Sequence, residues 1–281
     1  MRWLATRFVL GIVLAFVLPA CSKSEPASGA PSRELRLVSL TPSATEVVAA
    51  LGATDQLVGV DEYSTYPPSV KALPKVGSFL SPNLEVIVGL RPSVVIVDDV
   101  HGSTAGALRD AKIETLAVAI HGLPDVKRAL KEVGARIGRT AEADRAIAEI
   151  DGALDAMAAS RPAKRPRVLA IIDREAGGLG NLVAAGPGSW LDELLAVVGA
   201  ENVLAASGVR YPKLSLEEVL RGEPDVILDL SYGATADPWR TLAIPAAKTG
   251  RIVTLAEPYL VAPSPRVKQA LDALAAAVRG P

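Results

Sequence analysis

Cysteine is nearly absent from this 281-residue chain, and neither charge sign dominates it. The only cysteine is Cys21, which excludes an internal disulfide. Lys and Arg number 30 and Asp and Glu 31, with no long run of either sign, so binding to nucleic acid is not expected. Hydrophobic residues make up 49% and charged residues 22%, which excludes a disordered or collagen-like chain and predicts a large core in about two domains.

Motifs for catalysis and for nucleotide binding are also missing. There is no G-x-S-x-G, no Walker loop and no pair of cysteine and histidine that could act as nucleophile and base, which argues against an enzyme. The glycine-rich stretch at residues 177–181 does not complete a dinucleotide fingerprint, because Val183 stands where the last glycine should be. We therefore expect neither catalytic residues nor a resident cofactor.

No apolar run is long enough for a permanent membrane-spanning helix. Residues 8–20 are thirteen mostly apolar residues, whereas a bilayer core needs about 20. Arg2 and Arg7 precede this run, which is the pattern of a signal peptide, and the sequence LPAC at residues 18–21 resembles a bacterial lipobox. We expect residues 1–21 to be a lipoprotein signal peptide and Cys21 to carry the lipid that anchors an exported protein; an incidental cysteine after an ordinary signal is the alternative.

The rest of the chain is predicted to be a tether followed by two α/β lobes. Residues 22–34 are rich in Ser, Pro, Ala and Gly without apolar periodicity, which is typical of a flexible tether. Predicted strands then alternate with helices, which indicates mainly parallel sheets. We place the N-terminal lobe at residues 35–138, a linking helix at 139–162 and the C-terminal lobe at 163–281.

An internal repeat supports the two lobes. The pattern LEVI followed by PSVVI at residues 84–96 recurs as LEEV followed by PDVIL at residues 216–228, with equivalent positions 132 apart. Two copies are too few for a solenoid and indicate two similar lobes. Between them, residues 140–161 have helical periodicity and no proline, which predicts one continuous helix that bends little.

Several segments carry a resemblance to a known family. They are RLVSLTPSATE at residues 36–46, GVDEYSTYPP at 59–68, PNLEVI at 82–87, YPKLSLE at 211–217 and SPRV at 264–267. With this set the chain resembles the substrate-binding proteins of ABC importers for cobalamin and ferric siderophores, most of all the cobalamin-binding members. The resemblance runs from about residue 36 to the C-terminus. It implies two lobes joined by one helix, a small-molecule ligand between them and delivery to a permease dimer by a monomeric protein.

Glu85 and Glu217 are the predicted docking residues. Each falls in the first turn of a predicted helix, after Asn83 or Ser215 as the N-cap, at equivalent places in the two copies. An acid there stabilises its own helix without any partner, which is the simpler explanation. In the family that the chain resembles, these two glutamates dock into arginine pockets of the permease, and their recurrence favours that role here.

Ligand contacts are expected from the few aromatic residues. The resemblance implies that Tyr63, Phe79, Tyr211 and Tyr259 line the pocket; Tyr66 and Trp190 could equally be packing residues. Two departures from the cobalamin-binding members concern the ligand. Pro258 replaces their pocket acid, and Phe79 and Tyr211 replace tryptophan.

The two histidines, His101 and His121, fall in predicted loops near Asp98 and Asp99. They could form a free-metal site for zinc or manganese, contact a ferric chelate or be ordinary loop residues.

The leading hypothesis is a lipid-anchored protein that binds cobalamin or a related corrinoid. A ferric-siderophore or haem receptor is the alternative, ahead of a metal receptor, an exported enzyme or a structural envelope protein.

Overall fold

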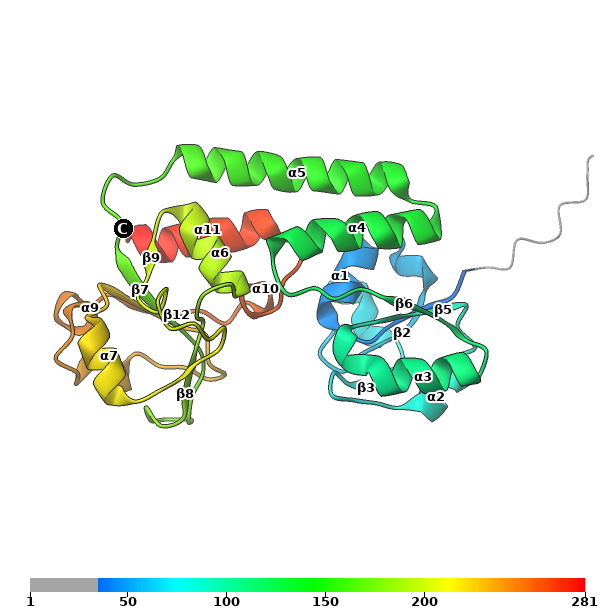
Figure 1. The fold of residues 1–281 in the computed structure, drawn as a ribbon, viewed down its shortest axis with the longest axis horizontal. Coiled ribbons are helices and arrows are strands. Elements are labelled where there is room, and N and C mark those ends of the chain that lie inside the picture. The colour runs from blue at the N-terminus through cyan, green and yellow to red at the C-terminus, as the bar shows by residue number, and fades with distance from the viewer. Residues whose placement is uncertain (1–34, 281) are drawn as a thin grey trace, which may run out of the picture. The chain divides into compact units, whose positions relative to one another are not determined.

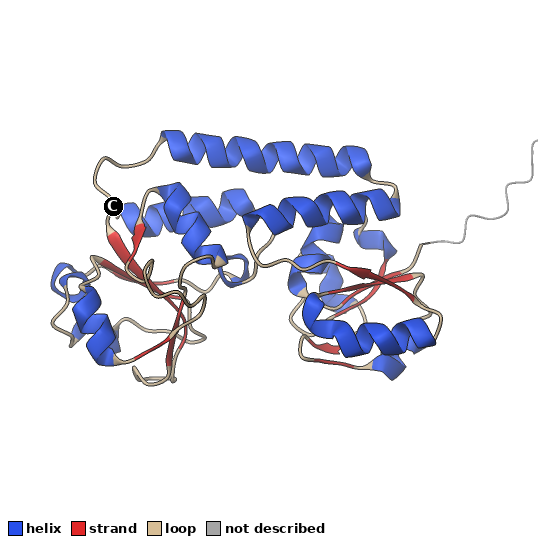
Figure 2. Cartoon of the chain, in the orientation of Figure 1, coloured by secondary structure: helices blue, strands red, loops and turns tan. Residues whose placement is uncertain are grey.

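The computed structural model describes residues 35–280, which form one compact unit. Residues 1–34 and Pro281 lie outside the described residues, and with them the predicted signal peptide, the tether and Cys21. The unit contains two α/β lobes, and the long helix α5 (Thr140–Ala159) runs over both (Figures 1 and 2). The predicted fold class of two α/β lobes with mainly parallel sheets joined by one long helix is confirmed.

The first lobe is built on a parallel sheet of four strands in the order β2-β1-β5-β6. The strands are β1 (Leu37–Ser39), β2 (Leu57–Val60), β5 (Val94–Val97) and β6 (Glu114–Ala117). Its helices are α1 (Pro42–Ala50), α2 (Leu84–Gly89), α3 (Gly102–Asp110) and α4 (Leu123–Ile137). All four residues of β5 are buried, as expected for a central parallel strand covered on both faces.

Short elements complete the first lobe. They are the 3-10 turns η1 (Thr54–Gln56), η2 (Pro68–Ala72) and η3 (Asp99–His101) and the antiparallel pair β3 (Gly77–Ser78) and β4 (Ser81–Pro82). Gly77 has a φ of +96°, and a Cβ there would meet the carbonyl oxygen of Ser81. Only glycine fits this tight turn, which carries Phe79 at its tip.

The second lobe has a mixed sheet in the order β10-β8-β7-β11-β12, with β9 also paired to β7. The strands are β7 (Arg167–Asp173), β8 (Leu182–Ala184), β9 (Glu201–Asn202), β10 (Lys213–Leu214), β11 (Val226–Asp229) and β12 (Ile252–Thr254). Strand β11 is parallel to β7 and β12, whereas β8 is antiparallel to β7 and β10. The helices are α6 (Trp190–Val198), α7 (Leu216–Gly222), α8 (Asp237–Arg240), α9 (Pro245–Thr249), α10 (Pro258–Val261) and α11 (Val267–Arg279).

A continuous apolar core joins the two lobes through their helices. Helix α5 packs on α4 of the first lobe and on α11 of the second, and one buried cluster includes Val47, Leu130, Leu194 and Leu271 from both lobes. Because this shared core would have to be disrupted for the lobes to separate at the helical layer, large hinge motion there is disfavoured. None of the helices within residues 35–280 has the length and apolar content needed to cross a bilayer.

Candidate ligand-binding cleft

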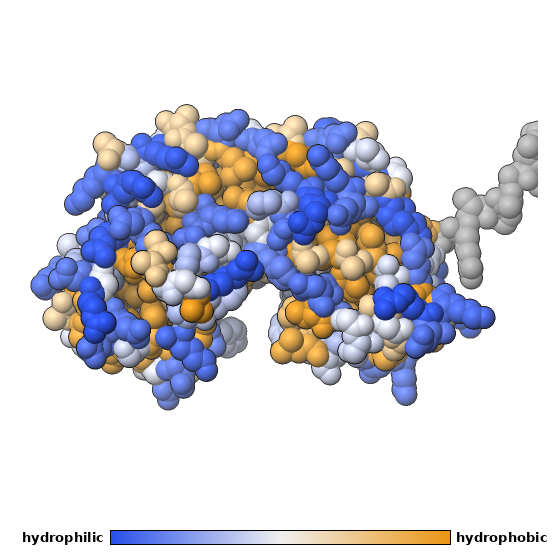
Figure 3. Space-filling model, in the orientation of Figure 1, coloured by the Kyte–Doolittle hydropathy of each residue, from blue (hydrophilic) through white to orange (hydrophobic). Residues whose placement is uncertain are grey.

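A cavity of about 780 Å³ lies between the lobes, at the carboxyl ends of their strands. From the first lobe it is lined by Pro42, Glu62, Tyr63 and Thr65, and from the second by residues that include Leu230, Tyr232, Thr254, Pro258 and Val261. Figure 3 shows this face of the unit hollowed between the lobes. A mostly apolar cavity of this size, at the edge where parallel sheets bind ligands, suits a small organic molecule.

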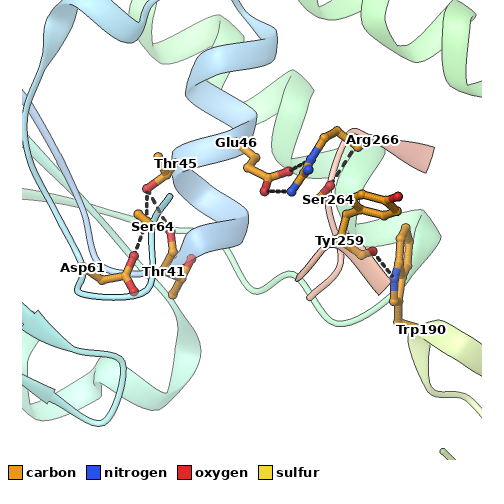
Figure 4. A network of polar contacts seen from close by, with 9 residues as sticks. All are labelled: Thr41, Thr45, Glu46, Asp61, Ser64, Trp190, Tyr259, Ser264 and Arg266. Carbon is orange, nitrogen blue, oxygen red and sulfur yellow. Dashed lines mark hydrogen bonds and ion pairs between the residues drawn. The ribbon is translucent and has the colours of Figure 1, made fainter. Parts of the chain in front are cut away.

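A chain of buried hydroxyl groups fixes the loop that carries Tyr63 (Figure 4). Ser39 Oγ lies 2.5 Å from Thr45 Oγ1, which lies 2.7 Å from Ser64 Oγ, and Ser64 donates to Asp61. The other carboxylate oxygen of Asp61 accepts the backbone N–H of Tyr63 at 3.0 Å. Burial raises the pKa of Asp61, although the hydrogen bonds from Ser64 and Tyr63 oppose that shift. The Tyr63 backbone is thus fixed while its side chain stays 64% exposed.

Tyr232, which follows β11, is a candidate ligand contact that the sequence analysis missed. Its side chain is fully exposed, at 101% of the reference area, although it lines the cavity. It thus faces the same cavity as Tyr63 but belongs to the other lobe. A tyrosine in a short loop directly after a buried strand was the only sequence signal for it.

A buried arginine supports the loop of Tyr232. Arg174 Nε donates to Asp229 Oδ2 at 2.7 Å, and Trp239 Nε1 donates to the same oxygen at 2.7 Å. The guanidinium also donates to the carbonyl oxygens of Gly178, at 2.7 Å, and Thr235, at 3.2 Å. The side chains of this ion pair are 2% and 0% exposed. Arg174 therefore ties the glycine-rich stretch to the loop that holds Tyr232, which gives the stretch a structural role.

Phe79 lies at the tip of the β3–β4 turn and packs edge-on against His101, with ring centroids 5.3 Å apart. Both nitrogens of His101 are engaged: Nδ1 accepts the Asp98 N–H at 3.0 Å, so Nε2 carries the proton and donates to the Phe79 carbonyl at 2.7 Å. His101 thus holds the turn in place, and its nitrogens are not free for a metal ion.

The other histidine meets two carboxylates. One ligand atom from each of Asp98, Asp99 and His121 lies within 4.8 Å of the others, and His121 Nε2 is 3.3 Å from Asp99. Burial, followed by the hydrogen bond with Asp99, raises the pKa of Asp98 to about 6, and the same hydrogen bond lowers the pKa of Asp99. Three groups from one lobe would leave an open coordination shell, unlike a closed structural zinc site.

The remaining predicted aromatic contacts lie apart from the cavity lining. Tyr211 borders a separate depression on the second lobe; burial raises the pKa of its phenol, Arg210 opposes the shift and Glu193 adds to it. Tyr259 lies next to the cavity residue Pro258 in sequence, and its carbonyl accepts Trp190 Nε1–H at 3.1 Å. The structure therefore brings Tyr63 to the cavity, whereas Phe79, Tyr211 and Tyr259 are not part of its lining.

A polar contact crosses between the lobes near Tyr211. Glu193 of α6 accepts the Leu123 N–H at the start of α4 at 2.6 Å. Burial raises the pKa of Glu193, and the hydrogen bond from Leu123 opposes that shift. A Cβ on Gly122 would lie 2.8 and 2.9 Å from the two oxygens of Glu193. A side chain on residue 122 would therefore displace the Glu193 carboxylate from this contact.

Glu85 and Glu217 occupy equivalent first-turn positions in α2 and α7, and both are exposed. Asn83 accepts the Val86 N–H at 3.1 Å, and Ser215 forms a capping box with Glu218, so each helix has its own cap. Glu217 pairs with Arg221 at 2.8 Å, whereas Glu85 has no ion-pair partner within residues 35–280. Neither carboxylate is needed as an N-cap, and both point to solvent from separate lobes.

Comparisons with known proteins agree on one family. The sequence model described as periplasmic binding protein matches residues 37–259. The vitamin B12-binding protein of Vibrio cholerae (strain O395) is 26% identical over 84% of this chain and 86% of its own length. That of Salmonella choleraesuis is 30% identical over 69% of this chain and 71% of its own.

Solved structures share the fold. The periplasmic haem-binding protein of Roseiflexus sp. RS-1 in apo form has a TM-score of 0.78 and 29% identity, covering 87% of this chain and 98% of its own. The periplasmic vitamin B12-binding protein of Vibrio cholerae has a TM-score of 0.71 and 25% identity, covering 87% and 96%.

Proposed function

The chain belongs to the periplasmic binding protein family, as a substrate-binding protein of ABC transport and not an enzyme, and on this premise we propose that it binds cobalamin or a related corrinoid between its lobes. The observation that carries the proposal is the apolar cavity of about 780 Å³, with an exposed tyrosine from each lobe. Large flat ligands are bound by aromatic faces with few polar contacts. The relatives named for vitamin B12 support this ligand class.

Isothermal titration tests the ligand. The chain from Ser22 onward is titrated with cyanocobalamin, with haemin and a panel of ferric siderophores in parallel. The proposal expects submicromolar, one-to-one binding of cyanocobalamin. Binding of an iron chelate without any binding of cyanocobalamin would contradict the corrinoid proposal and leave the transport role standing.

Haem is the second candidate ligand, because the Roseiflexus haem-binding protein is 29% identical with a TM-score of 0.78. An exposed tyrosine phenol such as that of Tyr232 offers ferric iron a hard oxygen donor. A haemin complex whose absorbance spectrum changes in Tyr232→Phe or Tyr63→Phe would favour haem. The same spectrum in both variants and the parent would remove this argument.

We further propose that Glu85 and Glu217 dock the protein onto the permease dimer. Two exposed carboxylates on separate lobes can pair with arginines of two permease subunits, and such pairs orient a complex and raise its association rate. Reversing both charges should abolish uptake of labelled ligand while binding in solution is unchanged. Normal uptake by this double variant would exclude the docking role.

The membrane anchor is proposed to be lipid on Cys21. Cys21→Ser should move the exported protein from the membrane fraction to the soluble fraction. Mass spectrometry of the parent N-terminus should show an acylated cysteine. A soluble parent protein with an unmodified Cys21 would contradict the anchor.

A further inference from the structure

An arginine of the second lobe forms an ion pair with a glutamate of the first lobe (Figure 4). Arg266 precedes α11 in the second lobe, and Glu46 lies on α1 in the first. Arg266 Nε donates to Glu46 Oε2 at 2.8 Å, and its NH2 group donates to Oε1. The side chains are 13% and 8% exposed. This is a bidentate pair, nearly removed from water, between residues 220 positions apart.

Aromatic residues from both lobes surround the same guanidinium. Its carbon lies 4.1 Å from the ring centroid of Tyr66, in the first lobe, and 4.6 Å from that of Tyr259, in the second. Trp190 holds the Tyr259 backbone through the hydrogen bond described above, and Ser264 Oγ accepts the Arg266 N–H at 3.1 Å. Arg266 is therefore oriented by its own lobe and contacts the other lobe through two different interactions.

The neighbours of this cluster in sequence form walls of the cavity. Thr65 lines the cavity and is followed by Tyr66, while Pro258 lines it and is followed by Tyr259. A change in the spacing between Tyr66 and Tyr259 must therefore shift both walls. We propose that Arg266 is a positioning residue that sets the spacing of the lobes and, through it, the width of the cavity.

The chemistry fits a positioning role better than a gain in stability. A buried ion pair roughly offsets its own desolvation, so it adds little net stability, but its bidentate geometry restricts both distance and angle. Lysine could supply the charge but not the planar fork or the stacking on tyrosine rings. Arg266→Lys should therefore keep the parent spacing of the lobes only in part. If the charge alone were required, the lysine variant would keep that spacing fully.

Electron spin resonance measures the lobe spacing without any ligand. Nitroxide labels are placed on Asp110→Cys, at the exposed end of α3, and Lys248→Cys, on the exposed side of α9, in the exported chain carrying Cys21→Ser. Arg266→Gln and Glu46→Gln should each lengthen and broaden the interlobe distance distribution. Arg136→Gln is the matched control, because Arg136 forms an equally bidentate pair with Glu114, at 2.6 Å for both bonds, inside the first lobe.

Ligand binding is a second readout, and only this readout rests on the proposed function. If the fraction of molecules with the binding-competent spacing falls to about a tenth, the apparent affinity for cyanocobalamin falls about tenfold. An unchanged distance distribution in the folded Glu46→Gln protein would overturn the positioning role, even if Arg266→Gln failed to fold. The distance distribution could shift in the variants while the parent protein binds neither cyanocobalamin nor haemin. That result would support the positioning role and overturn the proposed ligands instead.

Discussion

Equivalent strands of the two lobes each lead into a buried aspartate, but the two carboxylates stand one position out of step and have different surroundings. Asp98 follows β5 in the first lobe, beside Asp99 and His121, and burial raises its pKa to about 6. Asp229 ends β11 in the second lobe and is held by Arg174 and Trp239. The repeat has kept the strand but not the place of the acid, because Asp229 is equivalent to Val97 and Asp98 to Leu230. It has changed the polar groups that support the cleft loops, so each lobe fixes its loops by different chemistry.

The largest expected effect comes from breaking the support in the second lobe. Asp229→Ala leaves Arg174 buried without its partner and should lower the free energy of unfolding by about 3–5 kcal/mol. The comparable change in the first lobe, Ser64→Ala, removes a hydroxyl that donates to Asp61 and lies 2.7 Å from Thr45 Oγ1, and it should cost about 1–3 kcal/mol. Urea unfolding of the Cys21→Ser protein measures both. Equal costs would show that the two supports are energetically alike.

A double substitution separates the ion pair from simple packing. Arg174→Met with Asp229→Leu replaces both charges with apolar groups, and it should cost much less than Asp229→Ala alone. A double variant as unstable as the single one would mean that removing the unpaired charge of Arg174 gains no more than is lost with its carbonyl contacts.

The two cavity tyrosines test whether both lobes contribute to binding. Tyr63→Ala and Tyr232→Ala should each weaken cyanocobalamin binding by about 1–3 kcal/mol, because each removes an aromatic contact. Tyr211→Ala is expected to act in the same direction if the pocket extends to its depression on the second lobe. Isothermal titration of the three variants compares them; an unaffected affinity removes that residue from the site.

A pH series distinguishes Asp98 from its neighbour Asp99. The folded-state pKa of Asp98 is about 6, above its ordinary 3.8, so the stability contributed by its protonated form is complete below pH 3.8 and is lost as the pH rises to about 6. Asp98→Asn should flatten that decline and raise the Tm above pH 7 by about 2–4 °C. Asp99 has a lowered pKa, so Asp99→Asn should instead reduce stability at neutral pH. Circular dichroism melts between pH 4 and 7.5 measure this, and parallel curves for all three proteins would contradict it.

The smallest expected effect is an asymmetry in docking. Arg221 pairs with Glu217 at 2.8 Å, so under the proposed docking it would compete with a permease arginine for that carboxylate. The position equivalent to Arg221 beside Glu85 is Gly89, which offers no such competitor. An exposed pair of this kind is worth about 0.2–1 kcal/mol, so Arg221→Gln should strengthen docking at most about fivefold. Binding to the reconstituted permease tests this, with Arg240→Gln as the control, because Arg240 forms an exposed ion pair with Asp237 on another helix. Weaker docking in Arg221→Gln would show that Arg221 itself contacts the permease.

Local patterns predicted the repeated elements well. The repeated segment at residues 84–96 holds α2 and the start of β5, and its copy at residues 216–228 holds α7 and most of β11. The helix predicted at residues 140–161 spans Thr140–Ala159. The repeat also placed Glu85 and Glu217 in equivalent first turns. These features depend on neighbouring residues and on periodicity, which a single sequence contains.

The cleft contacts could not be predicted in the same way. Arg266 and Glu46 are 220 positions apart and Arg174 and Asp229 are 55 apart, and no periodicity connects either pair. The proximity of His101 to acids suggested a metal ligand, but two backbone hydrogen bonds occupy its ring nitrogens. Tyr232 lies outside the segments that carry the family resemblance, so no local pattern marked it as a ligand contact.

Gly122 sets a steric condition for a contact between the lobes. A Cβ at this position would lie 2.8 and 2.9 Å from the Glu193 oxygens, so another residue would displace the carboxylate that accepts the Leu123 N–H. The two polar contacts between the lobes therefore differ in kind, because Arg266 joins two side chains whereas Glu193 joins a side chain to the backbone at the start of α4. A substitution at either end can remove the Arg266 pair, but the backbone partner of Glu193 cannot be removed by truncating a side chain.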